Sequence, residues 1–224
     1  SGSYLGSNEY MVEYQQSVSS VTVAPRGNYV WNNVSVKNLG DLQSTDVNGL
    51  TLNLQDSCMT SYNSISSSAN NTCGVTSTGH IRCWGQNNFN QIGHGSTSNR
   101  KYPTVVAGDM QFSMVSTAST NTCAIATNGK LYCWGSNTYS QIGDGTTNAA
   151  PKPVAVDVAQ NYSRISMGVN HACGVTSSGV LKCWGRNLNG QLGDGSTTTR
   201  STPTVVDSGI FYISVSAGSN YTCG

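Results

Sequence analysis

Cysteine is the residue type most able to do chemistry in this 224-residue chain, which contains eight of them. Six fall into three pairs, each with nine intervening residues: Cys73 and Cys83, Cys123 and Cys133, Cys173 and Cys183. Such pairs could be disulfides, buried free thiols or zinc ligands. Zinc sites favour Cys-x-x-Cys spacings, often with His, whereas His80, His94 and His171 each lie at a different distance from the cysteines. The spacing therefore favours disulfides and predicts no metal site.

The other residues that could catalyse a reaction form no known catalytic pattern. The chain has no HExxH, no Walker loop and no G-x-S-x-G motif. Asp144 and Asp194 recur in Gly-Asp-Gly turns, but one carboxylate per 50 residues cannot build the oxygen cage of a calcium site, so we interpret them as turn residues. Trp84, Trp134 and Trp184 could stack on sugars, yet their strict repetition beside a cysteine favours packing between repeats. We therefore expect no enzyme activity and no cofactor.

The cysteine pairs belong to a repeat of 50 residues. Three segments superimpose without a gap and a fourth has just begun when the chain ends; the segments start at Cys73, Cys123, Cys173 and Cys223. The tryptophan after the second cysteine and the glycines of the Gly-x-Gly turn keep the same period. A fixed period of this length is typical of propellers and solenoids, in which each repeat is one supersecondary unit.

Each repeat is predicted to contain four short strands. Gln111–Ser116 and Tyr212–Ser216 mix apolar and polar residues in rough alternation, which is the period of a half-buried strand. A hairpin follows, and then a last strand that starts with proline, at Pro103–Val106, Pro153–Val156 and Pro203–Val206. Proline is tolerated at the head of a strand. Four short strands per 50 residues predict an all-β fold built from propeller blades.

The hairpin register brings the two cysteines of each pair together. If Ser77–Gly79 is a three-residue loop with glycine in the left-handed conformation, Cys73 faces Cys83. The cysteines then occupy a non-hydrogen-bonded pair with Cα atoms about 4.5 Å apart, inside the range that a disulfide spans. The same register applies in the next two repeats. The inward faces are then expected to carry Val75 and Ile81, Ile125 and Leu131, and Val175 and Leu181.

The pattern C-x-[VI]-x(3)-G-x(3)-C-W-G-x-N-x(3)-Q-[IL]-G-[DH]-G, found within residues 59–224, resembles the repeat of the regulator of chromosome condensation family in its bacterial secreted form. The resemblance implies a β-propeller, commonly of seven blades. The eukaryotic namesake is a nucleotide-exchange factor for a small GTPase, and secreted relatives include a β-lactamase inhibitory protein that binds through loops on one face. No residue here matches the contacts of either protein. Because similar folds host unrelated functions, the resemblance implies the fold and not an activity.

The sequence divides into three parts. Residues 59–224 hold the three disulfide-stapled repeats and the start of a fourth. Residues 18–58 are interpreted as a degenerate first blade, because Trp31 and Leu39-Gly40-Asp41 repeat the eight-residue spacing of the later repeats. The alternative is an immunoglobulin-like β segment, although a whole domain of that kind needs about 100 residues. Residues 1–17 form an N-terminal segment that could donate a strand.

The predicted disulfides imply an oxidising compartment, outside the cell or on its surface. No apolar run approaches the roughly 18 residues of a membrane span, so we expect no membrane-spanning segment. The net charge of +1 offers no strong attraction for nucleic acid. The charge is uneven, however: residues 1–72 carry five acids and two bases (net −3), and residues 73–224 carry five acids and nine bases (net +4).

Binding is the predicted function, and the loops at one end of the blades are the candidate sites, because loops on a rigid scaffold are where binding usually resides. The candidate contact residues are Phe89, Asn90, Arg100, Tyr139, Ser140, Arg186, Leu188 and Arg200. We expect an adhesin, a surface or filament component, or a protein inhibitor, with a protein or a surface glycan as its partner. One alternative is that the loops are solvent-exposed and make no contact. Another is an accessory or catalytic domain of a secreted polysaccharide-active enzyme, which would need paired carboxylates in a cleft.

Cys58 and Cys223 remain outside the three pairs. Cys223 occupies the place of the first hairpin cysteine of a fourth blade, and an unfinished blade leaves a strand edge with unpaired backbone groups. We expect residues 1–20, from this chain or from a neighbouring copy, to add a strand at that edge. The second route gives head-to-tail self-association.

Overall fold

The computed structural model describes residues 61–224 in full. Of the preceding residues it describes only the backbone of four strands: β1 (Gly2–Gly6), β2 (Glu9–Val12), β3 (Val36–Lys37) and β4 (Ser44–Thr45). The chain divides into two compact units, Ser1–Thr60 and Ser61–Gly224. In the first unit β1 pairs antiparallel with β2, and β3 with β4. Most of the predicted degenerate blade lies outside the described residues, and so does Cys58. The degenerate blade therefore stays a prediction, and no partner is assigned to Cys58.

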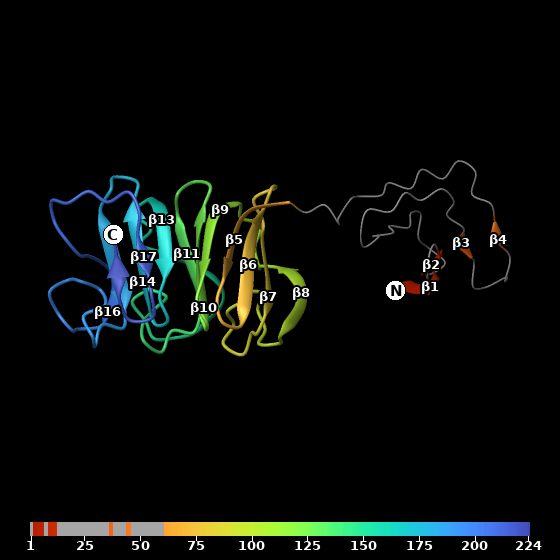
Figure 1. Ribbon diagram of the computed structural model, residues 1–224, viewed down its shortest axis with the longest axis horizontal. Helices are drawn as coiled ribbons and strands as arrows, with labels where there is room; N and C mark the ends of the chain where they lie inside the picture. Colours follow the sequence, from red (N-terminus) through yellow and green to blue (C-terminus); the bar gives the residue numbers. More distant parts are fainter. Residues whose placement is uncertain (1, 7–8, 13–35, 38–43, 46–60) are drawn as a thin grey trace. The chain divides into compact units, whose positions relative to one another are not determined.

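The second unit consists of three four-stranded antiparallel sheets followed by a two-stranded one (Figure 1). The first sheet contains β5 (Tyr62–Ser67), β6 (Asn71–Thr76), β7 (Ile81–Gly85) and β8 (Arg100–Val105). The second contains β9 (Phe112–Thr117), β10 (Asn121–Ala126), β11 (Leu131–Gly135) and β12 (Ala150–Val156). The third contains β13 (Tyr162–Met167), β14 (His171–Thr176), β15 (Leu181–Gly185) and β16 (Arg200–Val205). The last is formed by β17 (Ser216–Ala217) and β18 (Thr222–Cys223). The predicted all-β fold and its four-stranded blades are confirmed.

The hairpin between the second and third strands has the predicted register. In the first blade the amide of Gly79 donates to the carbonyl of Thr76 at 2.9 Å, and Gly79 has φ +83°, the left-handed conformation that glycine adopts without strain. Cys73 then faces Cys83 with a Cα separation of 4.1 Å, and the two form a disulfide. The other two cysteine pairs have the same register and the same separation. A short turn therefore fixes the geometry of each staple.

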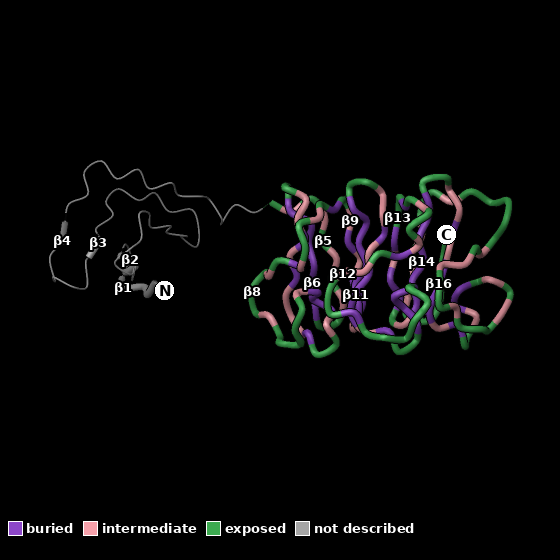
Figure 2. Tube along the Cα trace, turned by 180° about the vertical axis from the view of Figure 1, so that it is seen from behind, coloured by how far each residue is buried: buried purple, intermediate pink, exposed green. Residues whose placement is uncertain are grey.

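The buried residues concentrate in the inner strands of the blades, such as β10 and β14, whereas the outer strands β8 and β16 are largely exposed (Figure 2). None of the six predicted inward residues is more than 3% exposed: Val75, Ile81, Ile125, Leu131, Val175 and Leu181. Burying an aliphatic side chain of this size stabilises the fold by about 1.5–3 kcal/mol. The prediction of the inward face is confirmed.

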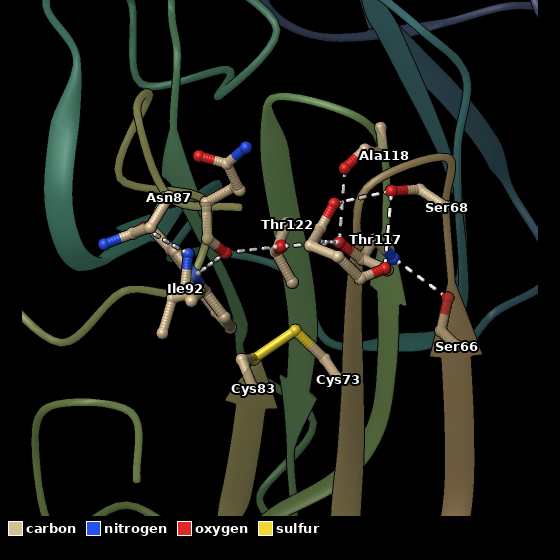
Figure 3. The surroundings of a disulfide bond; sticks show 12 residues. Ser66, Ser68, Cys73, Cys83, Asn87, Ile92, Thr117, Ala118 and Thr122 are labelled. Carbon is tan, nitrogen blue, oxygen red and sulfur yellow. Dashed lines mark hydrogen bonds between the residues drawn. A yellow bond between two sulfur atoms is a disulfide. The ribbon is translucent and has the colours of Figure 1, made fainter. Parts of the chain in front are cut away.

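A serine hydroxyl joins the first strands of adjacent blades at each junction. The amides of Thr117, Met167 and Ala217 donate to the hydroxyl oxygens of Ser66, Ser116 and Ser166, at 3.0, 3.1 and 2.9 Å. Figure 3 shows the first of these bonds beside the Cys73–Cys83 disulfide. Because each donor lies 51 residues after its acceptor, the repeat itself sets the contact between blades.

The outer strands start earlier than predicted. They begin at Arg100, Ala150 and Arg200 rather than at the prolines three residues later. In the first blade β7 pairs with β8 at Cys83–Thr104 and again at Gly85–Arg100, so the stretch between these pairs is irregular. Pro103 lies inside that stretch, on an edge strand where its missing N–H costs no ladder bond.

The predicted strand Tyr212–Ser216 is also wrong in extent, because only Ser216–Ala217 is extended there. In the third blade the equivalent strand β13 pairs along all of β14, up to Thr176. In the last sheet β17 has a two-residue partner, β18, and the register contains only Ser216–Cys223 and Ala217–Thr222. A short ladder cannot hold the preceding residues in a strand.

Candidate functional site

Each loop between the third and fourth strands of a blade is organised around one buried asparagine. The side-chain oxygen of Asn87 accepts from the amide of Ile92 at 2.9 Å (Figure 3). The Asn87 NH₂ group donates to the carbonyls of Ser96 and Ser98. Asn137 and Asn187 accept in the same way from Ile142 and Leu192, also at 2.9 Å. None of the three asparagines is more than 1% exposed. A satisfied buried amide of this kind holds a long loop in one conformation.

A buried glutamine four residues later fixes the tip of each loop. The side-chain oxygen of this glutamine accepts from the backbone amide of Phe89, Tyr139 or Asn189 at 2.8–2.9 Å. In the first loop the Gln91 NH₂ group also donates to the carbonyl of Ser119 in the next blade, at 2.9 Å. The loop tips are therefore attached to the scaffold through side chains that repeat along the sequence.

The repeated tryptophans pack between blades. The indole N–H of Trp134 donates to the carbonyl of Gln91, and that of Trp184 to the carbonyl of Gln141, at 2.9 and 3.0 Å. Both rings are fully buried. A Cβ added at Gly93 would lie 2.5 Å from the Trp134 ring nitrogen, so glycine is required there. The interblade interpretation is confirmed for these two residues, whereas Trp84 is half-buried and no described blade precedes it.

The acidic residue of the Gly-Asp-Gly turn serves the loop itself. The Asp194 carboxylate accepts from the amide of Ser196 at 3.0 Å and from Nε of Arg200 at 2.7 Å. Burial alone would raise the pKa of Asp194, but hydrogen bonds from Ser196 and Arg200 lower it to about 2. In the first blade His94 replaces the acid and accepts from Nε of Arg100 at 3.0 Å. Burial, and then the charge of Arg100, lower the pKa of His94.

Three of the candidate contact residues lie exposed at the loop tips. Phe89 is 48% exposed, Tyr139 41% and Leu188 60%, one side chain in each of three consecutive blades. Their loops all leave from the same end of the third strand, after β7, β11 and β15. A row of apolar side chains on fixed backbone is suited to contacting a partner surface. We refer to Phe89, Tyr139 and Leu188 as the tip row.

Two other candidate contact residues, Asn90 and Ser140, lie where the backbone turns after the loop tip. Asn90 and Ser140 adopt left-handed φ values of 64° and 58°, and Gly190 has φ 72° in the third loop. Ser140 is only 5% exposed, so little of its side chain is open to a partner. These positions turn the chain after the tip. Asparagine and glycine accept that conformation more readily than other residues.

The three candidate arginines differ in their partners. Arg100 and Arg200 hydrogen-bond to His94 and Asp194 within their own loops. The guanidinium carbon of Arg186 instead lies 5.3 Å from the ring centroid of Tyr139 in the preceding blade, and its Nε is buried without a hydrogen bond. The Arg186–Tyr139 pair joins two loops that lie 47 positions apart in sequence, which no local pattern could reveal.

Two sets of residues are not among the candidate contact residues. The buried asparagine and glutamine of each loop carry a signal in the sequence, because they recur at the 50-residue period. The apolar side chains around β17 and β18 were not singled out; Ile210, Phe211, Ile213 and Tyr221 are 52–89% exposed.

The described residues contain no group of three His, Cys, Asp or Glu side chains that could hold a metal ion. No helix in this part of the chain is long and apolar enough to span a membrane.

Comparison with known proteins identifies the family of these repeats. Two models described as "Regulator of chromosome condensation (RCC1) repeat" match the chain, one at residues 63–91, 105–141 and 162–191 and the other at 128–175 and 178–224. A search of curated proteins finds no match. Among solved structures, human WBSCR16 is similar at 19% identity and a TM-score of 0.66, over 73% of this chain and 44% of that one.

Two yeast structures are similar to the same extent. Prp20p from Saccharomyces cerevisiae, reported with its binding properties to Gsp1p and histones, has 18% identity and a TM-score of 0.64, over 72% of this chain and 42% of its own. Yeast RCC1 (Prp20) bound to Kap60 gives 18% identity, a TM-score of 0.63 and coverages of 72% and 41%. The chain spans less than half the length of these structures, and likeness at this identity shows the β-propeller fold alone. The chain belongs to the regulator of chromosome condensation (RCC1) repeat family.

Proposed function

We propose that the protein is a secreted or cell-surface binding protein that contacts a partner protein through the tip row. The observation that carries the proposal is the combination of exposed apolar tips with loop backbones that buried asparagine and glutamine side chains hold in place. Phe89 and Tyr139 project from backbone that buried glutamines hold in place. Binding through fixed loops loses little conformational entropy, which favours affinity.

The three disulfide-distance cysteine pairs support an oxidising compartment. Each pair lies in the core, with its cysteines no more than 1% exposed. This supports a secreted or cell-surface location, and within it we propose the bacterial secreted form of the family, acting as an adhesin, a surface or filament component, or an inhibitor.

The carboxylates of the second unit give little support to the alternative of a polysaccharide-active enzyme. Asp144 and Asp194 accept hydrogen bonds from their own turns. Asp157 pairs with Lys182 at 2.7 Å. Glycoside hydrolysis needs two carboxylates facing one cleft, and three of the five acids of residues 61–224 are already used in local contacts.

The test is retention of proteins from the medium and surface of the source cells by immobilised wild type and two triple variants. F89A/Y139A/L188A removes the tip row. V158A/I210A/V205A removes exposed apolar side chains elsewhere in the same unit. We expect the first variant to lose the proteins that wild type retains and the second to keep them. Equal retention by all three proteins would contradict the proposal.

Self-association by strand addition remains a second part of the proposal. The outer edge strands contain Pro103, Pro153 and Pro203, which lack a donor and disfavour addition at the rim. Among the sheets of residues 61–224, β17–β18 has two strands and the other three have four, so we propose it as the acceptor for a strand from a neighbouring copy. Deletion of residues 1–20 should then lower the mass measured in solution, and an unchanged mass would contradict this part.

A further inference from the structure

We propose that the loops of the second and third blades bind an acidic protein segment, in which a carboxylate pairs with Arg186 and an adjoining apolar side chain contacts Tyr139 and Leu188. This inference rests on the proposed function and names the chemistry of the partner.

Arg186 is the arginine of this face whose charge is not used within the loops. Nε of Arg200 donates to Asp194 at 2.7 Å, and Nε of Arg100 donates to His94 at 3.0 Å. Within the described residues the Arg186 side chain makes no hydrogen bond or ion pair, and its Nε is buried. An arginine presents a planar fork that matches a carboxylate through two parallel hydrogen bonds. The two terminal nitrogens of Arg186, which are not among the buried atoms and form no hydrogen bond within the described residues, are therefore available to an anionic acceptor.

The residues around Arg186 restrict its conformation and provide apolar surface beside it. Its guanidinium lies over the Tyr139 ring, with 5.3 Å between guanidinium carbon and ring centroid, which restricts its rotamers before a partner arrives. The backbone amide of Tyr139 is held by Gln141 at 2.8 Å. Leu188 lies two residues after Arg186 and is 60% exposed. Tyrosine and arginine are both enriched in the hot spots of protein interfaces.

Charge favours an acidic partner. Residues 73–224 have nine bases and five acids, a net charge of +4. This excess attracts acidic segments over about 8–10 Å at moderate salt, and the fixed arginine then selects the carboxylate.

A protein segment fits this surface better than an acidic glycan. Sugar recognition requires polar side chains directed outward beside an aromatic ring, to bond to hydroxyls. Here the repeated amides Asn137, Asn187 and Gln141 are buried and bonded within the scaffold, which leaves Thr138 and Asn189 as the exposed polar residues next in sequence to Tyr139 and Leu188. The exposed neighbour Leu188 instead offers aliphatic surface, which suits a leucine or phenylalanine side chain.

The experiment measures binding of a short fluorescein-labelled peptide that alternates Glu with Leu and Phe, by fluorescence anisotropy with the full chain. R186Q removes the charge at the site. R164Q is the matched control, since it removes the same charge from exposed Arg164 on β13. R186K keeps the charge without the fork, and L188D places a negative charge beside the arginine. Circular dichroism of each variant establishes that it is folded.

We expect binding by wild type and R164Q within about twofold of each other, and binding at least about tenfold weaker for R186Q and L188D. R186K should fall between them. Equal weakening by R186Q and R164Q would show an effect of net charge and overturn the inference. So would equal binding of a peptide with Gln in place of Glu, or binding of oligogalacturonate in place of the peptide. Loss of partner retention in F89A/Y139A/L188A together with full retention in R186Q would overturn the acidic partner alone and leave the proposed function intact.

Discussion

The loops that follow β7, β11 and β15 contain an interior and a tip that differ in repetition and in burial. Asparagine and glutamine occupy the same interior places in all three loops, and these residues are at most 3% exposed. The tips carry phenylalanine, tyrosine and leucine and are 41–60% exposed. Repetition therefore marks the scaffold, because the same hydrogen bonds are needed at every blade. Variation marks the surface that a partner can meet.

The largest expected effect separates these two regions by stability. W134A removes a fully buried ring and its hydrogen bond to Gln91, and should lower the free energy of unfolding by about 3–5 kcal/mol. Y139A truncates an exposed side chain and should cost less than about 1 kcal/mol. Urea unfolding of both variants measures the difference. Similar losses for the two would show that tip and scaffold are one region.

His171 is expected to make the stability of the third blade more sensitive to pH than that of the first two. It replaces the asparagine of the first two blades, is fully buried, and its Nε2 lies 3.0 Å from the Thr222 hydroxyl. Burial lowers the pKa of His171 from 6.5 to about 4. The unfolded chain therefore binds the proton first, and stability that is complete above pH 6.5 falls as the pH drops toward 4, by about 3 kcal/mol.

H171N restores the asparagine of the other blades and should remove this share of the acid sensitivity. Melting temperatures of wild type and H171N at pH 7 and pH 4.5 provide the measurement. An identical drop in both proteins would show that the His171 contact does not sense pH.

Removing a disulfide is expected to weaken the scaffold without changing the tip row. C123A/C133A removes one staple of a short loop, and in the chain-entropy model should cost about 2–3 kcal/mol. Binding through the tip row should persist while the variant stays folded. Mass spectrometry without reductant should find all three pairs, and alkylation of these six cysteines in the native protein would contradict both the staples and the oxidising compartment.

The smallest expected effect compares two versions of the same turn. H94D gives the first blade the acid of the third, where Asp194 bonds to Arg200 at 2.7 Å. A partly exposed ion pair with Arg100 should add about 0.3–1 kcal/mol, and less at high salt. H94N keeps the size of the side chain without the charge and serves as control. Equal melting temperatures for H94D and H94N at low salt would show that the turn does not use the charge.

The sequence specified the blades more fully than the candidate surface, for a physical reason. The Cys73–Cys83 register follows from a three-residue turn, because the length and type of a hairpin turn determine which residues of the two strands face each other. The stacking of Arg186 on Tyr139 depends on how one blade sits against the next, which no local rule supplies. Ser140 resembles its exposed neighbours in type, and its burial depends on tertiary packing, since Asn90 has a similar left-handed φ at the equivalent place and is not buried.

Amide hydrogen exchange tests the central claim, a prepared loop surface, most directly. The backbone amides of Phe89, Tyr139 and Asn189 donate to buried glutamine oxygens although their side chains face solvent. In the free protein these three amides should therefore exchange about 100-fold or more slowly than unstructured amides, and Q141A should release Tyr139 alone. Exchange of all three at the rate of an unstructured chain would contradict the account, because the tips would then be mobile before any partner binds.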